Sequence, residues 1–344
     1  MLLTAPADTG RRRPRIRRWV LGAALAALVV LALVSITVGA RPIDLPSTLA
    51  ILSGASDAST RVDEVVLWTL RVPRTVLAVV VGAALGTAGA LIQAVTRNPL
   101  ADPGIIGVNA GASLFVVLAV SVLGWGGVLA TAGAGMLGAL LALLAIMALS
   151  ARGRMSPLVL VLAGTALAAA VGGVTSAILI IDSDAFDQVR FWTVGSLAGR
   201  DPDLIWPAAA LVAVASLAAV AIAVRVNTLA LGDDMAKSLG TSVVRTRTIA
   251  VITVAVLCGT ATAAAGPIAF VGLAVPFAAR AVAGTETRWI LTLSIVFGGL
   301  LLLAADIMGR AIAGTGELEA GIVVAFVGAP LFIWMARRRS VEHL

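Results

Sequence analysis

Long apolar runs recur along the whole chain, and the charged residues collect in the short segments between them. A run of about 20 apolar residues is long enough to cross a lipid bilayer as an α-helix. The ten spans predicted from these runs are residues 19–40, 74–95, 105–123, 127–149, 158–181, 204–224, 248–265, 268–283, 289–309 and 320–336. The short alternating segments that mark a transmembrane β-barrel are absent from the sequence. The pattern predicts an all-α polytopic membrane protein.

The seventh and eighth spans lie in one uncharged run from Thr248 to Ala279. That run is long for one crossing and short for two. Gly266 and Pro267 stand inside it, and such a pair interrupts a helix because proline lacks an N–H and clashes with the preceding turn. Two helices separated at this pair are therefore predicted.

The first apolar run follows a basic segment and could be taken for a signal peptide that ends near Ala40. Its apolar part is about 22 residues long, whereas the apolar region of a signal peptide has about 7–15 residues. A retained first span is the favoured interpretation.

The basic residues set the predicted orientation. With ten spans and both termini cytoplasmic, 18 of the 25 Lys and Arg residues fall on the inner side, as the positive-inside bias requires. Nine spans would place Arg337–Arg339 outside. The predicted organisation is a basic cytoplasmic tail at 1–18, a transmembrane domain at 19–339 and a cytoplasmic tail at 340–344.

Composition narrows the class further. Only 12% of the residues are charged, against about 25% in soluble globular proteins. A pI near 11.3 would suit nucleic acid, but the basic residues flank the spans, so the bilayer is the expected partner and nucleic acid is not. Cys258 and His343 are the single cysteine and histidine, and no metal site or cofactor is expected.

Asp306 is the one acid inside a predicted span, and Arg310 follows it by one helical turn. Residues at this spacing face each other on a helix, so an ion pair is predicted. Proton- or ion-driven carriers need ionisable residues within their spans. The near absence of such residues argues against an ion-driven secondary transporter, which stays open as an alternative.

A polar module at 228–247 interrupts the apolar pattern between the sixth and seventh spans. Gly232 is predicted to begin a short helix, with acids in its first turn, Lys237 in its last turn and Gly240 just beyond it. Leu231, Met235 and Leu239 recur every four residues and would form one apolar stripe. Thr241 or Ser242 is expected to cap a second helix.

An amphipathic module on the cytoplasmic side can lie on lipid or dock into a protein groove. Its acids disfavour an anionic bilayer, so docking into a protein is the preferred interpretation. Lys237-Ser238 also suggests a phosphate-binding loop, but the glycine that precedes the lysine in that motif is Ala236 here. ATP binding is therefore expected on another chain, and the chain itself is not expected to be an enzyme.

Several blocks resemble one known family. "LALGDDMAKSLG" is similar to the cytoplasmic coupling loop of the iron-chelate and vitamin B12 permeases, the FecCD-type subunits of type II ABC importers. Further blocks resemble this family in the same order, namely "RVPRTVLAVVVGAALGTAGALIQAVTRNPLADPGIIGVNAGAS" at 71–113, "GPIAFVGLAVPFAAR" at 266–280, "LLLAADIMGR" at 301–310 and "VGAPLFIW" at 327–334. The resemblance covers about residues 19–339 and implies ten spans with both termini inside.

The resemblance also implies partners and sites. Two ATP-binding subunits would bind the coupling helices of 228–247, with the contact residues Leu231, Gly232, Asp233, Met235, Ala236, Leu239 and Gly240. An extracytoplasmic substrate-binding protein would dock on Arg71, Arg74 and Arg310, at outer span ends. The cytoplasmic gate would be formed by Asn98, Leu100, Ser156 and Pro157.

Within the family, "FDQVRFWTVGSLAGR" at 186–200 is most similar to ferric enterobactin-type permeases, which implies a ferric siderophore as substrate, with vitamin B12 or haem as the alternative. Phe277 stands where the family usually has a histidine. "GTGELEAGIVVAF" likewise lacks the usual prolines around its glutamate. These departures favour a second, different permease subunit, and so a heterodimer rather than a homodimer.

Overall fold

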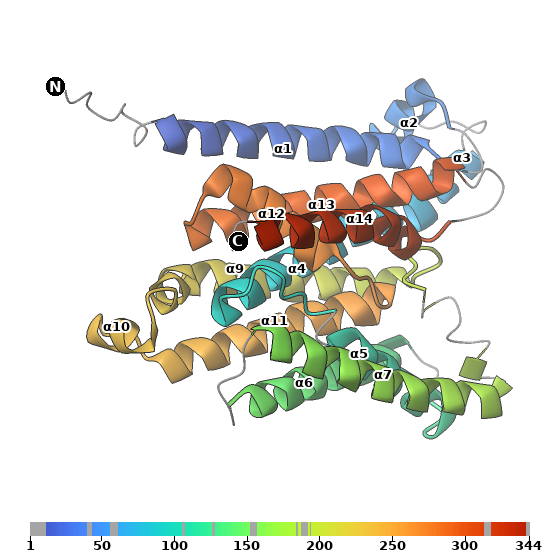
Figure 1. Ribbon diagram of the computed structural model, residues 1–344. Coiled ribbons are helices and arrows are strands. Elements are labelled where there is room, and N and C mark those ends of the chain that lie inside the picture. Colours follow the sequence, from blue (N-terminus) through green and yellow to red (C-terminus); the bar gives the residue numbers. More distant parts are fainter. Residues whose placement is uncertain are drawn as a thin grey trace.

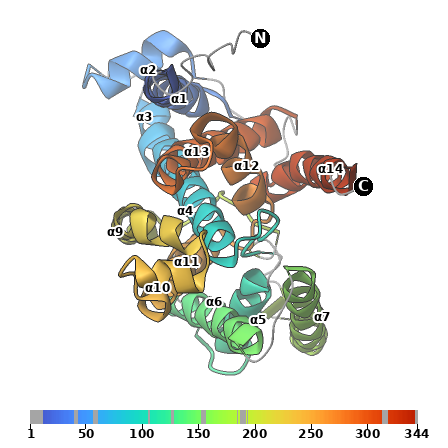
Figure 2. The same ribbon diagram turned by 60° about the vertical axis from the view of Figure 1, so that its left-hand side comes forward.

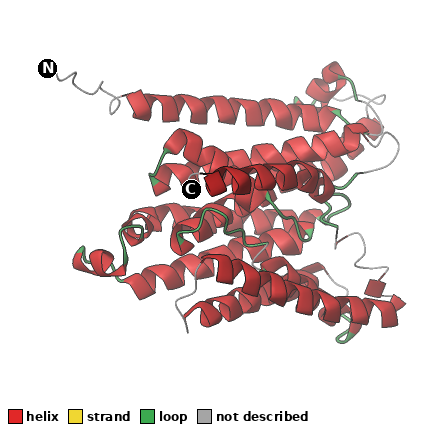
Figure 3. Cartoon of the chain, in the orientation of Figure 1, coloured by secondary structure: helices red, strands yellow, loops and turns green. Residues whose placement is uncertain are grey.

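The computed structural model describes residues 12–39, 43–55, 61–104, 107–125, 128–151, 157–183, 185–186, 192, 194–312 and 318–341. Every regular element in these ranges is a helix (Figure 3). The helices are α1 (Arg12–Thr37), α2 (Leu45–Leu52), α3 (Arg61–Val66), η1 (Leu67–Arg71), α4 (Val72–Thr96), α5 (Val108–Ser121), α6 (Val128–Ala151), α7 (Pro157–Ile181), α9 (Pro202–Leu229), α10 (Asp233–Ser238), α11 (Val243–Ala265), α12 (Val271–Ala283), α13 (Thr287–Ile312) and α14 (Ala320–Val341).

The long helices run side by side in one bundle (Figure 1). The short helix α10 lies at one end of this bundle and α2 and α3 lie at the other, so the two are called the α10 end and the α2 end below. Viewed closer to the bundle axis, α4 occupies the middle (Figure 2). It packs against α9, α11, α12 and α13, while α1 lies on α13 and α5 joins α6 and α7.

Six helical segments are long and apolar enough to cross a membrane: Arg15–Thr37, Arg61–Thr96, Leu162–Ile181, Pro202–Leu229, Val243–Ala265 and Thr287–Ile312. Four shorter apolar helical segments accompany them, at Val108–Ser121, Ala130–Ile146, Val271–Ala283 and Ala320–Pro330. The ten together lie at the ten positions predicted from the apolar runs. The prediction of an all-α polytopic membrane protein is confirmed.

The predicted interruption at Gly266-Pro267 is confirmed. Helix α11 ends at Ala265, and Gly266 follows it with a φ of 79°, a conformation that glycine adopts without strain. Helix α12 begins at Val271, after Phe270 in a left-handed conformation. The uncharged run thus forms two helices.

Two helix starts differ from the sequence prediction. Helix α1 begins at Arg12, inside the predicted basic tail. The second span does not begin at residue 74, because one helical segment of 36 residues runs from Arg61 to Thr96. It contains the π-helical turn Leu67–Arg71, which ends two residues before Pro73. Proline cannot donate the normal backbone hydrogen bond, and a π turn is one way in which a helix accommodates such a loss.

Glycines let α4 approach its neighbours at backbone distance. Gly82 faces the carbonyl oxygen of Gly298 on α13, and Gly89 faces that of Gly272 on α12, so closely that a methyl group at either glycine would collide with it. A methyl group on Gly86 would lie 2.5 Å from the Ser294 carbonyl oxygen. Small residues at such spacing hold helices together in lipid, where van der Waals packing replaces the hydrophobic effect.

We predict that Gly89→Ala destabilises the protein by about 1–3 kcal/mol, because the added methyl group forces α4 and α12 apart. The matched control is Gly172→Ala on α7, where a methyl group would meet nothing within 4 Å. Thermal unfolding in detergent should show a lower midpoint for Gly89→Ala and an unchanged or higher midpoint for the control. Equal midpoints for the two variants would contradict this account of the packing.

Candidate functional site

Three helices bring an ion-pair cluster together at the α2 end. Asp306 on α13 is fully buried, and its carboxylate lies between two guanidinium groups. Arg310 Nη2 is 3.0 Å from Asp306 Oδ2, which confirms the predicted pair one turn apart. Arg74 of α4 donates from Nε to Asp306 Oδ1 at 2.9 Å. This second pair could not be predicted from the sequence, because the two residues are 232 positions apart in the chain.

Arg310 and a third arginine, Arg71, bind the C-terminal end of α1. Arg310 Nη1 donates to the carbonyl oxygens of Ser35 (2.9 Å) and Val38 (2.6 Å). Arg71 Nη1 donates to those of Ile36 (2.7 Å) and Thr37 (2.8 Å). The last carbonyl groups of a helix lack partners within the helix and carry partial negative charge. The two arginines therefore satisfy the end of α1 and complement its dipole.

The residues predicted to dock a binding protein are thus brought together, but they face inward. The exposed fraction is 7% for Arg71 and 9% for Arg310, and 11% for the side chain of Arg74. Their guanidinium groups are engaged by Asp306 and by α1. Docking through these arginines stays a prediction, and their first role in the structure is to join α1, α4 and α13.

At the opposite end, α10 follows the sequence prediction closely. Gly232, with a φ of 105°, precedes its first residue, and Gly240, with a φ of 78°, lies just beyond its end. The predicted apolar stripe is exposed, at 62% for Leu231, 54% for Met235 and 58% for Leu239. Exposed large apolar residues in one row are typical of a surface that a partner covers.

The rest of the module joins α11 and the bundle. The second expected helix is the first part of α11, which begins at Val243 and continues without a break to Ala265. Ser242 occupies its N-cap position without a capping side-chain bond. Ala236 faces inward, fully buried with Leu229 and Val243.

Asp233 also turns toward the bundle. Its carboxylate accepts two hydrogen bonds from Arg247 of α11, at 3.0 Å and 2.9 Å, and one from Arg97 Nη2 at 2.7 Å. Partial burial acts to raise the pKa of Asp233, but the hydrogen bonds and charges of Arg247 and then Arg97 outweigh it and lower the pKa below its usual value. The group stays ionised at neutral pH, and the stability that it contributes is lost only as the pH falls through this lowered pKa.

Arg97 connects this module to the predicted gate loop after α4. It ends α4 in a left-handed conformation with a φ of 52°. Asn98 is 4% exposed, and its side-chain oxygen accepts a hydrogen bond from the backbone N–H of Leu100 at 3.0 Å. Asn98 therefore shapes its own turn, while Leu100 is half-buried. Pro157 begins α7, and Ser156 lies outside the described residues.

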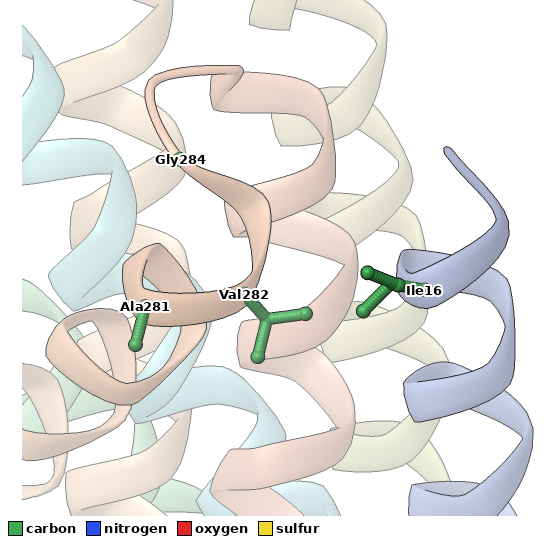
Figure 4. A pocket seen from close by; sticks show the side chains of 4 residues that line it. All are labelled: Ile16, Ala281, Val282 and Gly284. Carbon is green, nitrogen blue, oxygen red and sulfur yellow. The ribbon is translucent and has the colours of Figure 1, made fainter. Parts of the chain in front are cut away.

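Two hollows lie near the α10 end. One, of about 330 Å³, is lined by residues of the α4 end and of α9, α12 and α13, among them Arg97, Pro99 and Asn227. The other, of about 320 Å³, lies where α1 meets the end of α12. Figure 4 shows the side chains of Ile16 and Val282 pointing toward each other across it.

The folded chain is thus a polytopic helical membrane protein with an exposed apolar stripe at one end and a buried arginine cluster at the other. A family model described as the FecCD transport family matches residues 27–338. The chain belongs to this family, whose members are multi-pass membrane permeases of bacterial ABC importers. It is a transport subunit rather than an enzyme.

Individual relatives agree with this family assignment. The chain is 41% identical to the ferric enterobactin transport system permease protein FepD of Escherichia coli (strain K12), over 92% of this chain and 94% of FepD. It is 39% identical to the Fe(3+)-citrate import system permease protein YfmD of Bacillus subtilis (strain 168), over 80% of this chain and 82% of YfmD. A solved protein described as a metal-chelate type ABC transporter in an inward-facing conformation has a TM-score of 0.80 and 25% identity, covering 93% of this chain and 99% of that one.

We predict that Asp306→Asn lowers the free energy of unfolding by about 3 kcal/mol or more, because it leaves two buried guanidinium groups without their carboxylate. Asp203→Asn, at an exposed carboxylate in the first turn of α9, should cost under about 1 kcal/mol. Thermal unfolding of both variants in detergent measures the difference. A midpoint for Asp306→Asn that equals that of the control would show that the cluster does not stabilise the fold.

Proposed function

We propose that the chain is the permease subunit of an ABC importer that moves a ferric siderophore across the bacterial inner membrane. The observation that supports this most is the 41% identity to FepD along nearly the whole chain. The similarity to YfmD, an Fe(3+)-citrate permease, supports a ferric chelate more generally. Vitamin B12 and haem are the alternative substrates within the same architecture.

An ion-driven secondary transporter is less well supported. Such a carrier needs an intramembrane acid that exchanges a proton or an ion. Asp306 is fully buried, and the guanidinium groups of Arg74 and Arg310 both lie within 3.0 Å of its carboxylate. Both arginines therefore already occupy this carboxylate, which leaves it no open face toward a transported ion.

In the proposed topology ten helices cross the membrane and both termini are cytoplasmic. The α10 end is then the cytoplasmic side, with tails at 1–18 and 340–344, and the α2 end is the outer side. This assignment is supported by the basic residues at both chain ends and by Arg97, Arg245, Arg247 and Arg280 near α10.

Transport requires partners on both sides. Two ATP-binding subunits bind the α10 stripes of two permeases, and their closure on ATP tilts the helices. A different second permease completes the pathway, an arrangement that Phe277 and the motif at 314–326 favour. Phe277 stacks edge-to-face on Trp334 of α14, with ring centroids 6.0 Å apart. The chain can be purified without any other permease and tested for transport with the ATPase and the binding protein. Substrate transport by such a homodimer would contradict the proposed heterodimer.

The inner gate is proposed to consist of Asn98, Leu100, Ser156 and Pro157. Asn98 fixes the turn through its bond to the Leu100 N–H, and Leu100 supplies the apolar side chain that narrows the pathway. In a Cys258→Ser background, Leu100→Cys should cross-link to the second permease only in the inward-closed state. Equal cross-linking in all nucleotide states would exclude this gate.

The binding protein is proposed to dock at the α2 end, with its carboxylates directed to Arg71, Arg74 and Arg310. Because these side chains are engaged with Asp306 and α1, carboxylates of the binding protein would compete with internal partners. Such docking weakens as salt is raised. Binding that is insensitive to both salt and Arg71→Ala would contradict docking through this cluster.

Uptake assays test the function directly. We predict that proteoliposomes containing the assembled transporter take up a ferric siderophore only with ATP inside and with the binding protein outside. A panel of ferric enterobactin, ferric citrate, ferric hydroxamates, haem and cobalamin identifies the substrate. Uptake driven by a proton gradient without ATP would contradict the proposed ABC importer. Uptake of cobalamin or haem alone would contradict the proposal that the substrate is a ferric siderophore.

We also predict that Leu239→Asp strongly reduces binding of the ATPase, because it puts a charge into the exposed apolar stripe. Ser238→Asp introduces the same carboxylate one residue away, on a side chain off the stripe, and should retain binding. Co-purification of the ATPase with each variant is the measurement. Full ATPase binding by Leu239→Asp would show that the stripe is not the docking surface.

A further inference from the structure

One carboxylate joins three segments at the α10 end. Asp233 is the first residue of α10. Arg247, in the first turns of α11, holds it with two parallel hydrogen bonds. Arg97, the residue that ends α4 and begins the gate loop, holds the same carboxylate from the other side at 2.7 Å. The cluster Arg97–Asp233–Arg247 is called the latch below.

The outward and inward faces of α10 have different partners. Leu231, Met235 and Leu239 are exposed and lie outside the latch. On the inward face, Ala236 packs with Leu229 of α9 and Val243 of α11, so that α10 is attached to the helices on either side of it. The latch adds an attachment to α4, a segment 136 residues away in the chain.

The geometry of the latch suits the transmission of movement. A bidentate arginine fixes the direction of a carboxylate as well as its position, so Arg247 keeps Asp233 aimed at Arg97. The side chains of Arg97, Asp233 and Arg247 are 39%, 39% and 41% exposed. Water screens ion pairs at such exposure. The latch therefore orients the carboxylate of Asp233, but its ion pairs are weak enough to break and re-form during movement.

The gate loop is directly attached to the latch. Arg97 precedes Asn98, whose backbone and side chain form the turn that carries Leu100. Arg97 and Pro99 also line the hollow of about 330 Å³ between α4, α9 and α13. A displacement of Arg97 therefore moves the start of the gate loop, and the hollow beside it gives the loop room.

We propose that Asp233 is a positioning residue that transmits movement of α10 to the gate loop through Arg97, rather than a contact for the ATPase. The inference rests on the proposed function, in which the ATPase binds the outward stripe of α10. The module is then divided between an outward face that receives the movement and an inward carboxylate that passes it on. Removal of the charge of Asp233 leaves docking intact and disconnects the gate.

The chain offers a matched control for this proposal. Asp234 is the next residue on the same helix, and its side chain is fully exposed. It pairs with Lys237 of α10 itself at 3.5 Å. Asp233→Asn and Asp234→Asn therefore make the same chemical change and remove the same charge near the same helix terminus, and only the first breaks the latch.

The experiment uses the complete transporter in proteoliposomes, with its ATPase, second permease and binding protein. Three quantities are measured for each variant: the amount of ATPase bound, the rate of ATP hydrolysis, and the substrate taken up per ATP hydrolysed. Asp233→Asn is expected to bind ATPase normally and to hydrolyse ATP, but to reduce uptake per ATP by about tenfold. Asp234→Asn is expected to match the unsubstituted protein in all three.

Arg97→Gln breaks the same ion pair from the other side and keeps the proposal testable if Asp233→Asn does not fold. It should reproduce the loss of uptake per ATP. The double variant Arg97→Gln/Asp233→Asn should be no worse than either single variant, because residues that act through one contact are not additive. Arg97→Gln combined with Asp234→Asn should behave as Arg97→Gln alone.

The outcomes distinguish a failure of the latch from a failure of the proposed function. Unchanged uptake per ATP in Asp233→Asn overturns the latch while the importer stands. Loss of ATPase binding in Asp233→Asn also overturns it, because Asp233 would then be a docking residue. Additive losses in the double variant overturn transmission through Arg97. An unsubstituted protein that binds no ATPase and shows no ATP-dependent uptake overturns the proposed function and the latch together.

Discussion

The backbone contact between α4 and its neighbours α12 and α13 is the constraint on which the rest of the structure depends. Lipid chains are as apolar as leucine, so helices gain little in a membrane by merely covering apolar side chains. Gly82, Gly86 and Gly89 instead let α4 approach the backbones of Gly298, Ser294 and Gly272. Larger residues at these positions would separate the helices and weaken the dispersion contacts of the whole core.

This close packing positions ion pairs at both ends of α4. At the α2 end it brings Arg74 to the carboxylate of Asp306 on α13, and the resulting cluster takes up the C-terminal carbonyl groups of α1. At the α10 end it sets Arg97 beside α10, where Asp233 accepts its hydrogen bond. One helix thus connects the side proposed to receive the binding protein with the side proposed to receive the ATPase. In the proposed transport cycle, the pathway opens first to one side of the membrane and then to the other. This change would require the other helices to move around α4, while α4 itself stays straight.

Local features of this structure could be predicted from the sequence, and distant contacts could not. The apolar runs located the ten apolar helices, Gly266-Pro267 located the break before α12, and Gly232 and Gly240 located both ends of α10, because each signal acts within a few residues. The contacts of Arg71 and Arg74, and those of Arg310 with α1, could not be predicted from the sequence. Their partners are Asp306 and the end of α1, and Arg74 and Asp306 are 232 residues apart in the chain. The contact between Asp233 and Arg97 could not be predicted for the same reason, since nothing near Asp233 in the sequence points to Arg97.

The close contact of Gly89 with Gly272 predicts that α4 and α12 move as one rigid unit during transport. Spin labels at Leu70 in η1 and Ala281 in α12, both at exposed positions, measure the distance across this unit in a Cys258→Ser background. Pulsed electron paramagnetic resonance on the assembled transporter should give distances that agree within about 2 Å between the nucleotide-free and ATP-bound states. A change of about 5 Å, the rise of one helical turn, would show that α4 slides past α12 and would contradict the account.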